Sequence, residues 1–219
     1  VLPTFAPELC LSHDEIDMVC VGEGEKALVE LCNRMEKDEY YEDIPNLWFK
    51  TKHGIKKNPI GPPVDINNNP LLDMSLFDKS RLYRPMQGKV WRMLPVETHR
   101  GCPYQCTYCN SPAQQNFYRK ATGCGYFRSK SFEMIHKDLK HFKEEMKAEA
   151  FYFWADTFMV YTDKEFDRFI EMYSDIRLPF WCQSFPALIK EERIKKLMKI
   201  GLFRLGSGVE HGNEEFRLK

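Results

Sequence analysis

The sequence predicts an α/β protein in which repeated strand–helix steps build a parallel sheet. From residue 89 onward, short apolar runs alternate with longer segments of helical periodicity, which is typical of βα units. Three closely spaced cysteines follow the first of these strands directly. A proline-rich stretch, residues 59–88, separates this region from a shorter strand–helix unit ahead of it and is typical of a linker.

The N-terminal part predicts one strand–helix unit and a hairpin. Residues 16–21 form an apolar run that indicates a short buried strand, and Gly22 to Glu25 form a turn. A helix is expected next, because apolar residues recur there at helical spacing. Residues 45–58 predict a hairpin that turns near His53.

Four strand–helix steps fit the region from residue 89. Strands are expected over residues 93–98, 150–155, 179–183 and 203–209, and helices over 131–148, from 162 and over 191–200. Thr162 and Glu165 form a capping box that opens the second helix, and Gly201 is suited to end the third. The fourth step is incomplete, so the last strand should form an unpaired edge. The aromatic run Phe151 to Trp154 is interpreted as core of a strand buried on both faces.

Composition excludes several classes of protein. Lys+Arg and Asp+Glu both number 32, so no net charge favours nucleic acid or an anionic membrane. No run of about 18 apolar residues indicates a membrane span, and no signal peptide is visible, which favours the reducing cytoplasm. The chain starts at Val1 and ends in a charged stretch, which we interpret as a piece of a longer protein.

The most informative motif is the spacing Cys-x3-Cys-x2-Cys formed by Cys102, Cys106 and Cys109. A structural zinc site closes with four protein ligands, and an iron–sulfur electron carrier uses four thiolates per cluster. Three close thiolates instead favour a cubane cluster with one iron open to a ligand. Two alternatives stay open: a zinc site that takes a remote fourth ligand such as Cys124 or a histidine, and an iron–sulfur electron carrier.

The segment from Glu97 to Cys109 resembles the cluster loop of radical S-adenosylmethionine (SAM) enzymes, with Tyr108 as the aromatic residue before the last cysteine. The residues of this segment are most similar to those of the subgroup that carries an N-terminal cobalamin-binding domain. The resemblance implies a partial (β/α) radical SAM barrel, truncated after about four strands and preceded by the C-terminal end of a Rossmann-like cobalamin-binding domain. The implied domains are residues 1–44 as the cobalamin-domain remnant, 45–88 as hairpin and linker, and 89–219 as the N-terminal part of the radical SAM core.

The resemblance also implies cofactors and their contacts. Cys102, Cys106 and Cys109 would hold a [4Fe–4S] cluster whose open iron binds SAM, and electron transfer would give a 5′-deoxyadenosyl radical. Tyr108 would lie near the adenine, Asp156 would accept hydrogen bonds from the SAM ammonium group, and Glu210 would bind the ribose hydroxyls. Alternatively, Asp156 is a cap or turn residue and Glu210 a solvated loop charge.

The resemblance also implies partners and a class of reaction. A reductant such as flavodoxin or ferredoxin would supply the electron, and cobalamin is expected only in the full-length protein, because the ligand histidine of the cobalamin motif is absent here. The reaction could be a methyl transfer on a small-molecule or unknown substrate. The sequence indicates no catalytic acid, base or nucleophile. We interpret Cys182 as a buried thiol and His99 and His211 as structural residues.

Overall fold

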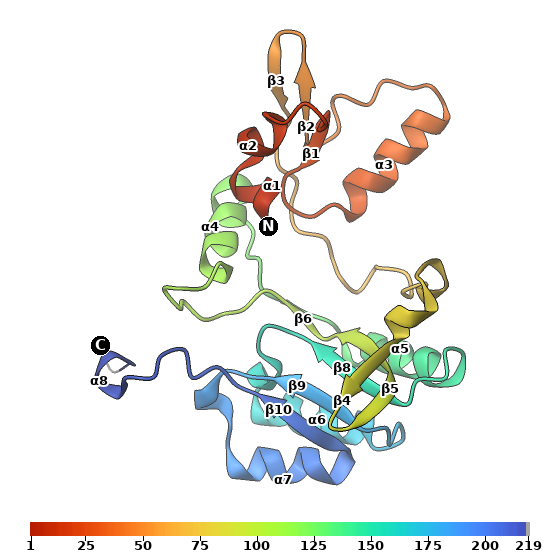
Figure 1. The fold of residues 1–219 in the computed structure, drawn as a ribbon, viewed down its shortest axis with the longest axis vertical. Coiled ribbons are helices and arrows are strands. Elements are labelled where there is room, and N and C mark those ends of the chain that lie inside the picture. Colours follow the sequence, from red (N-terminus) through yellow and green to blue (C-terminus); the bar gives the residue numbers. More distant parts are fainter. Residues whose placement is uncertain (218–219) are drawn as a thin grey trace. The chain divides into compact units, whose positions relative to one another are not determined.

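The computed structural model describes residues 1–217, which form two compact units (Figure 1). The first unit comprises residues 1–65 and 103–126. The second comprises residues 66–102 and the described residues from 127 onward. Each unit has its own sheet and its own hydrophobic core. None of the described helices has the length and apolar character needed to cross a membrane.

The first unit is built on a three-stranded antiparallel sheet. The strands follow the order β1 (Met18–Cys20), β2 (Leu47–Thr51) and β3 (Gly54–Lys57). The predicted N-terminal strand and the predicted hairpin are both confirmed, and β1 pairs with β2. Four helices complete the unit: α1 (Leu2–Phe5), α2 (Pro7–Leu11), α3 (Glu25–Glu36) and α4 (Ser111–Thr122).

Helix α3 confirms the predicted helix and packs through its apolar positions, whereas α4 was not predicted. Ala27 and Leu31 of α3 are buried in a cluster with Leu47 and Phe49 of β2. Helix α4 ends at Gly123, whose φ of 74° lies in the left-handed region that favours glycine. The periodicity of α4 is weak because Phe117 and Tyr118 are its large apolar residues.

The second unit contains a five-stranded sheet of strand order β10-β9-β8-β5-β4. The bounds are β4 (Tyr83–Met86), β5 (Lys89–Glu97), β8 (Ala150–Trp154), β9 (Phe180–Gln183) and β10 (Leu202–Gly206). β5, β8, β9 and β10 are parallel, which confirms the four predicted steps, and β10 is an edge strand as expected. A short antiparallel pair, β6 (His99–Arg100) with β7 (Arg128–Ser129), lies outside this sheet.

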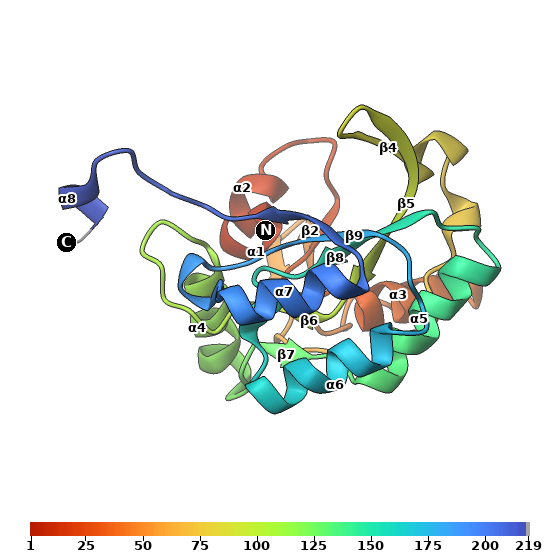
Figure 2. The same cartoon turned by 90° about the horizontal axis from the view of Figure 1, so that it is seen from below.

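Three helices cover one face of this sheet, as Figure 2 shows, and a short fourth helix, α8 (Glu214–Arg217), follows β10. These helices are α5 (Phe132–Glu144), α6 (Asp163–Tyr173) and α7 (Glu191–Ile200). The predicted capping box of Thr162 and Glu165 opens α6, and Gly201 ends α7 with a φ of 118°. A side chain at Gly201 would lie 2.7 Å from the Leu178 carbonyl oxygen, so this position requires glycine for packing as well.

The two faces of the sheet differ, and this corrects one prediction. Phe151 and Phe153 are buried in the core beneath the helices, as interpreted. Tyr152 is half-buried on the opposite face, and Trp154 on that face is 58% exposed. The interpretation of all four aromatic residues as core is therefore wrong, because alternate residues of a strand point to opposite faces and helices cover only one.

The predicted linker contains regular structure. Two 3₁₀ turns, Met74–Leu76 and Lys79–Leu82, lead into β4, which pairs antiparallel with the start of β5. Pro85 is tolerated within β4 because this strand forms an edge of the sheet. Because the segment is rich in proline, its composition did not predict β4, the fifth strand of the sheet.

Candidate functional site

The candidate residues of the second unit follow the carboxyl ends of its parallel strands. In the strand register, Glu97 at the end of β5 lies opposite Trp154 at the end of β8, and Gln183 of β9 lies opposite Gly206 of β10. Cys102 follows β5 and β6, Asp156 follows β8, and Glu210 follows β10. Ligands of open α/β sheets bind at this edge.

The three candidate cluster cysteines lie on an irregular loop between β6 and α4. None of the eight cysteines, all of which the structure describes, forms a disulfide. Cys109 is exposed, and Cys102 and Cys106 are half-buried. Within residues 1–217, no three or more His, Cys, Asp or Glu side chains are close enough to hold a metal ion. The donor set fits an iron–sulfur cluster in number, chemistry and access, and the thiols would have to gather around it.

Cys106 and Cys109 belong to a turn that leads into α4. The Cys109 backbone N–H donates to the Cys106 carbonyl oxygen at 3.1 Å. The Ser111 N–H, at the first position of α4, donates to Cys109 Sγ at 3.4 Å. The first N–H of α4 is thus a hydrogen-bond donor to a candidate ligand sulfur. Tyr108 in this turn is 65% exposed.

An ion pair at the end of β5 was not predicted. Arg100 Nε donates to Glu97 Oε1 at 2.8 Å, and its Nη2 donates to Glu97 Oε2 at 3.2 Å. This two-pronged pair ties the last residue of β5 to β6, two residues before Cys102. The only sequence feature that could have predicted this ion pair is the three-residue spacing between Glu97 and Arg100.

His99 is a buried structural residue, as interpreted. Its ring lies 4.5 Å from the ring of Tyr161 and stacks on Phe127 at 5.7 Å. Nδ1 hydrogen-bonds the Thr98 hydroxyl at 3.0 Å. Burial lowers the pKa of His99 to about 4, so the ring is neutral at physiological pH.

Asp156 is exposed, and its side chain has no hydrogen-bond or ion-pair partner among residues 1–217. Nearby protein atoms remove part of the water around this carboxyl, and this desolvation raises its pKa. The neighbouring Thr157 is buried, and its hydroxyl lies 3.3 Å from the Ser184 hydroxyl, which joins the loops after β8 and β9. A carboxylate without a partner on a fixed loop is available to accept hydrogen bonds from a ligand cation.

Glu210 occupies a strained turn. Its φ is 66°, in the left-handed region, and its side chain is exposed. A side-chain carbon on Gly208 would lie 1.9 Å from Glu210 Oε1, so the carboxylate folds back over Gly208, and a substitution there would displace this flexible side chain. His211, the next residue, accepts the Asn213 N–H on Nδ1 at 3.0 Å, which supports the structural interpretation of this histidine.

Cys182 is fully buried in the core on the helix-covered side of β9. Burial raises the pKa of its thiol to about 12, so it stays protonated. This confirms its interpretation as a buried thiol and removes it from the candidate site.

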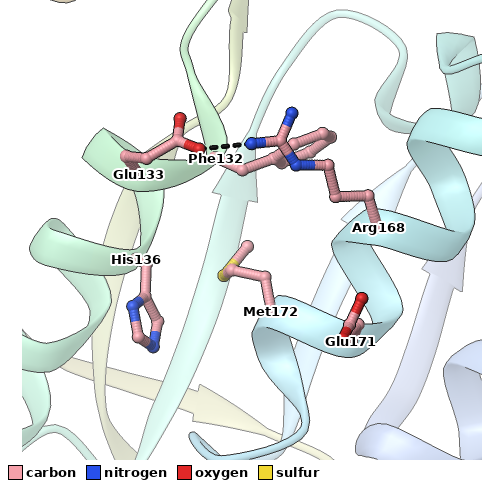
Figure 3. Close-up of a pocket in the computed structure, with 6 residues that line it drawn as sticks. All are labelled: Phe132, Glu133, His136, Arg168, Glu171 and Met172. Atoms are coloured by element: carbon pink, nitrogen blue, oxygen red, sulfur yellow. Dashed lines mark hydrogen bonds and ion pairs between the residues drawn. The ribbon is translucent and has the colours of Figure 1, made fainter.

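A pocket of about 260 Å³ lies elsewhere, between α5 and α6 (Figure 3). Its lining residues are Phe132, Glu133, His136, Arg168, Glu171 and Met172. Arg168 and Glu133 form an ion pair across it. The pocket belongs to the helix layer, and none of the candidate residues lines it.

The sequence of the chain is similar to that of a known protein. The chain is 27% identical over 202 residues to an uncharacterized methyltransferase of Pyrococcus horikoshii, covering 90% of this chain and 41% of that protein. The chain therefore spans about two fifths of that relative's length.

Solved structures show the same fold. A structure of the radical SAM methyltransferase TsrM from Kitasatospora setae, with cobalamin and a [4Fe–4S] cluster bound, matches 97% of this chain and 42% of its own with a TM-score of 0.67 at 18% identity. A structure of the cobalamin-dependent SAM radical enzyme OxsB, with aqua-cobalamin and SAM bound, matches 99% of this chain and 31% of its own with a TM-score of 0.66 at 20% identity.

The family model described as the radical SAM superfamily matches residues 96–219, which is more than half of the chain and includes all three candidate cluster cysteines. This superfamily uses a [4Fe–4S] cluster together with SAM. The sequence, the parallel sheet and the family match agree, and the chain belongs to the radical SAM superfamily.

Proposed function

We propose that the whole protein cleaves SAM reductively with a [4Fe–4S] cluster held by Cys102, Cys106 and Cys109. The observation that carries this proposal is the Cys-x3-Cys-x2-Cys loop that follows the first parallel strand, β5, and the short strand β6, within the family match. When bound and reduced, the cluster supplies one electron to the SAM sulfonium, and the bond from sulfur to the 5′ carbon breaks to give methionine and a 5′-deoxyadenosyl radical.

The residues of the chain bind and orient SAM. Asp156 accepts hydrogen bonds from the ammonium group, which its partner-free carboxylate supports. Tyr108 lies against the adenine, and the position of this aromatic residue in the cysteine loop, between Cys106 and Cys109, supports this role. Glu210 accepts hydrogen bonds from the ribose hydroxyls, and its place after β10 at the carboxyl edge supports this role.

The proposed function includes an assignment of three parts of the chain. Residues 1–44 are the end of a Rossmann-like cobalamin-binding domain, 45–88 are hairpin and linker, and 89–219 are the N-terminal part of the radical SAM core. Cobalamin binding and methyl transfer are assigned to the full-length protein. The names of the similar proteins support this, since two are methyltransferases and two have structures with a cobalamin bound. The electron comes from a reductant such as flavodoxin or ferredoxin in the reducing cytoplasm.

The test is anaerobic reconstitution of the chain with iron and sulfide, followed by electron paramagnetic resonance of the reduced protein with and without SAM. Cys106→Ala should lose both the cluster signal and SAM cleavage, because two thiolates cannot hold the cluster. The control, Cys124→Ser, should keep both, whereas a four-thiolate site that used Cys124 would lose its metal. SAM cleavage by Cys106→Ala, or stoichiometric zinc without a cluster signal in folded protein, would overturn the proposal.

A further inference from the structure

The turn formed by Gly22, Glu23, Gly24 and Glu25 is fixed by contacts from distant parts of the first unit. The Gly22 N–H donates to the Thr4 hydroxyl at 3.2 Å. Glu23 Oε2 accepts the Val64 N–H at 2.7 Å. A strand-to-helix turn needs neither contact in order to form. The turn therefore has a role in holding other segments in place.

The shortest of these contacts comes from α4. The Glu23 N–H donates to the Tyr118 hydroxyl at 2.6 Å, across 95 residues of sequence. Tyr118 is 2% exposed, and its ring stacks on that of Tyr126 at 5.0 Å. The preceding residue, Phe117, contacts Phe5 of α1 edge-on, and Figure 1 shows α4 beside α1 and α2. The turn and α4 thus form one packed element.

Gly22 allows Tyr118 to reach the turn. Its φ of 92° is in the left-handed region, and a side-chain carbon there would lie 2.7 Å from the Tyr118 hydroxyl and 3.0 Å from Asn46 Nδ2. Both neighbours are buried, so neither can move aside at low cost. Glycine is therefore required here for close approach as well as for backbone conformation.

The same helix carries the end of the cysteine loop. The first residue of α4, Ser111, donates its N–H to Cys109 Sγ. Ser111 and Tyr118 are the buried residues of α4, and seven positions, about two turns or roughly 10 Å, separate them. A helix fixed at Tyr118 therefore also fixes the direction of the N–H that reaches Cys109.

We infer that the contact of the Gly22–Glu23 turn with Tyr118 positions the Cys106–Cys109 half of the cluster loop, so that Tyr118 and Gly22 are positioning residues for the cluster. The inference rests on the proposed function in that it takes Cys106 and Cys109 as cluster ligands. Hydrogen bonds to ligand sulfurs adjust the electronic properties and potential of iron–sulfur clusters. A loosened α4 would therefore change the spectrum of the cluster as well as the stability of the unit.

The first test is Tyr118→Phe, which removes the hydroxyl and keeps the ring. Hydrogen exchange of the amides in residues 111–122 should become roughly 3- to 10-fold faster, as expected for the loss of one hydrogen bond. After reconstitution, the resonance of the reduced cluster should broaden or shift. The matched control is Tyr40→Phe, because the Tyr40 hydroxyl bonds to Lys56 on the surface of the same unit.

The second test uses two glycines. Gly22→Ala should speed exchange of the α4 amides and change the cluster resonance. Gly54→Ala serves as control, because its φ of 110° imposes a comparable backbone penalty while nothing lies within 4 Å of the added carbon. In a Tyr118→Phe background, Gly22→Ala should alter exchange in α4 less than it does alone, since the atom nearest to the new methyl group is gone.

The outcomes distinguish a failure of the positioning role from a failure of the proposed function. If Tyr118→Phe and Gly22→Ala match their controls in α4 exchange and in the cluster resonance, the inference is wrong. The inference is also wrong if exchange changes and the cluster resonance does not, because the contact then only stabilises the unit. If the wild-type chain takes up no cluster in folded form, the proposed function fails and the positioning role fails with it, whatever exchange in α4 shows.

Discussion

On β8 and β9, the side chains beneath the helices and those on the opposite face differ in chemistry. Phe153 and Cys182 point to the helices and are fully buried. On the opposite face, Tyr152 and Trp181 stack at 3.9 Å and are only partly buried, and Arg204 lies over Trp181. Aromatic rings with polar atoms are typical of surfaces that bind ligands, whereas hydrocarbon packing stabilises a fold. One strand can thus serve stability on one face and recognition on the other.

The largest effect should come from truncating the helix-covered face. Phe153→Ala removes a fully buried ring that contacts Phe158, Phe169 and Phe180, and should lower the free energy of unfolding by about 3–5 kcal/mol. Its neighbour Trp154 is 58% exposed, so Trp154→Ala should cost less than about 1 kcal/mol. Urea unfolding measures both, and equal losses would show that the two faces contribute alike to stability.

The helix-covered core also contains a titratable ring. His99 packs on Tyr161, a member of this core, and burial lowers the pKa of His99 from 6.5 to about 4. The unfolded chain therefore binds the proton first as the pH falls, and stability should decline between pH 6.5 and about 4 by roughly 3 kcal/mol from this group.

The measurement is the free energy of unfolding against pH for the wild type and for His99→Phe, which keeps a ring but cannot be protonated. The variant should show a smaller slope in this window. Parallel curves for the wild type and His99→Phe would contradict a neutral, buried His99.

The smallest effect should come from the open edge of the sheet and should concern binding. Asp156→Asn should weaken SAM binding roughly 10-fold through the loss of a charge-assisted hydrogen bond, and should change stability little because Asp156 is exposed. Titration calorimetry on the anaerobically reconstituted chain measures this, with Asp167→Asn on α6, an exposed residue that pairs with Lys196 of α7, as control. Unchanged affinity for SAM would assign Asp156 to the loop alone.

Local signals predicted most of the elements that the structure contains. The capping box at Thr162 and the glycine at 201 marked helix ends because caps depend on nearby residues. The cysteine spacing indicated the family because ligand spacing is local as well. The apolar run over residues 150–154 did not reveal which face the helices cover, since that depends on packing with distant segments.

Helix α4 and strand β4 were missed for the same reason. Much of the support for α4 comes from Tyr118, whose partner is 95 residues away, and β4 contains a proline that only its edge position explains. At the candidate site, the sequence indicated Asp156 and Glu210. The contact between Thr157 and Ser184 joins two loops and leaves no local pattern.

The first unit is formed from two separate stretches of chain, residues 1–65 and 103–126. During synthesis, this unit cannot complete its packing until Tyr126 has been made, by which time β4 and β5 of the other unit have already emerged. Contacts of such long sequence separation close slowly. Folding of the first unit therefore depends on the stretch of chain that carries the cysteine loop, which passes from the second unit into the first after Cys102.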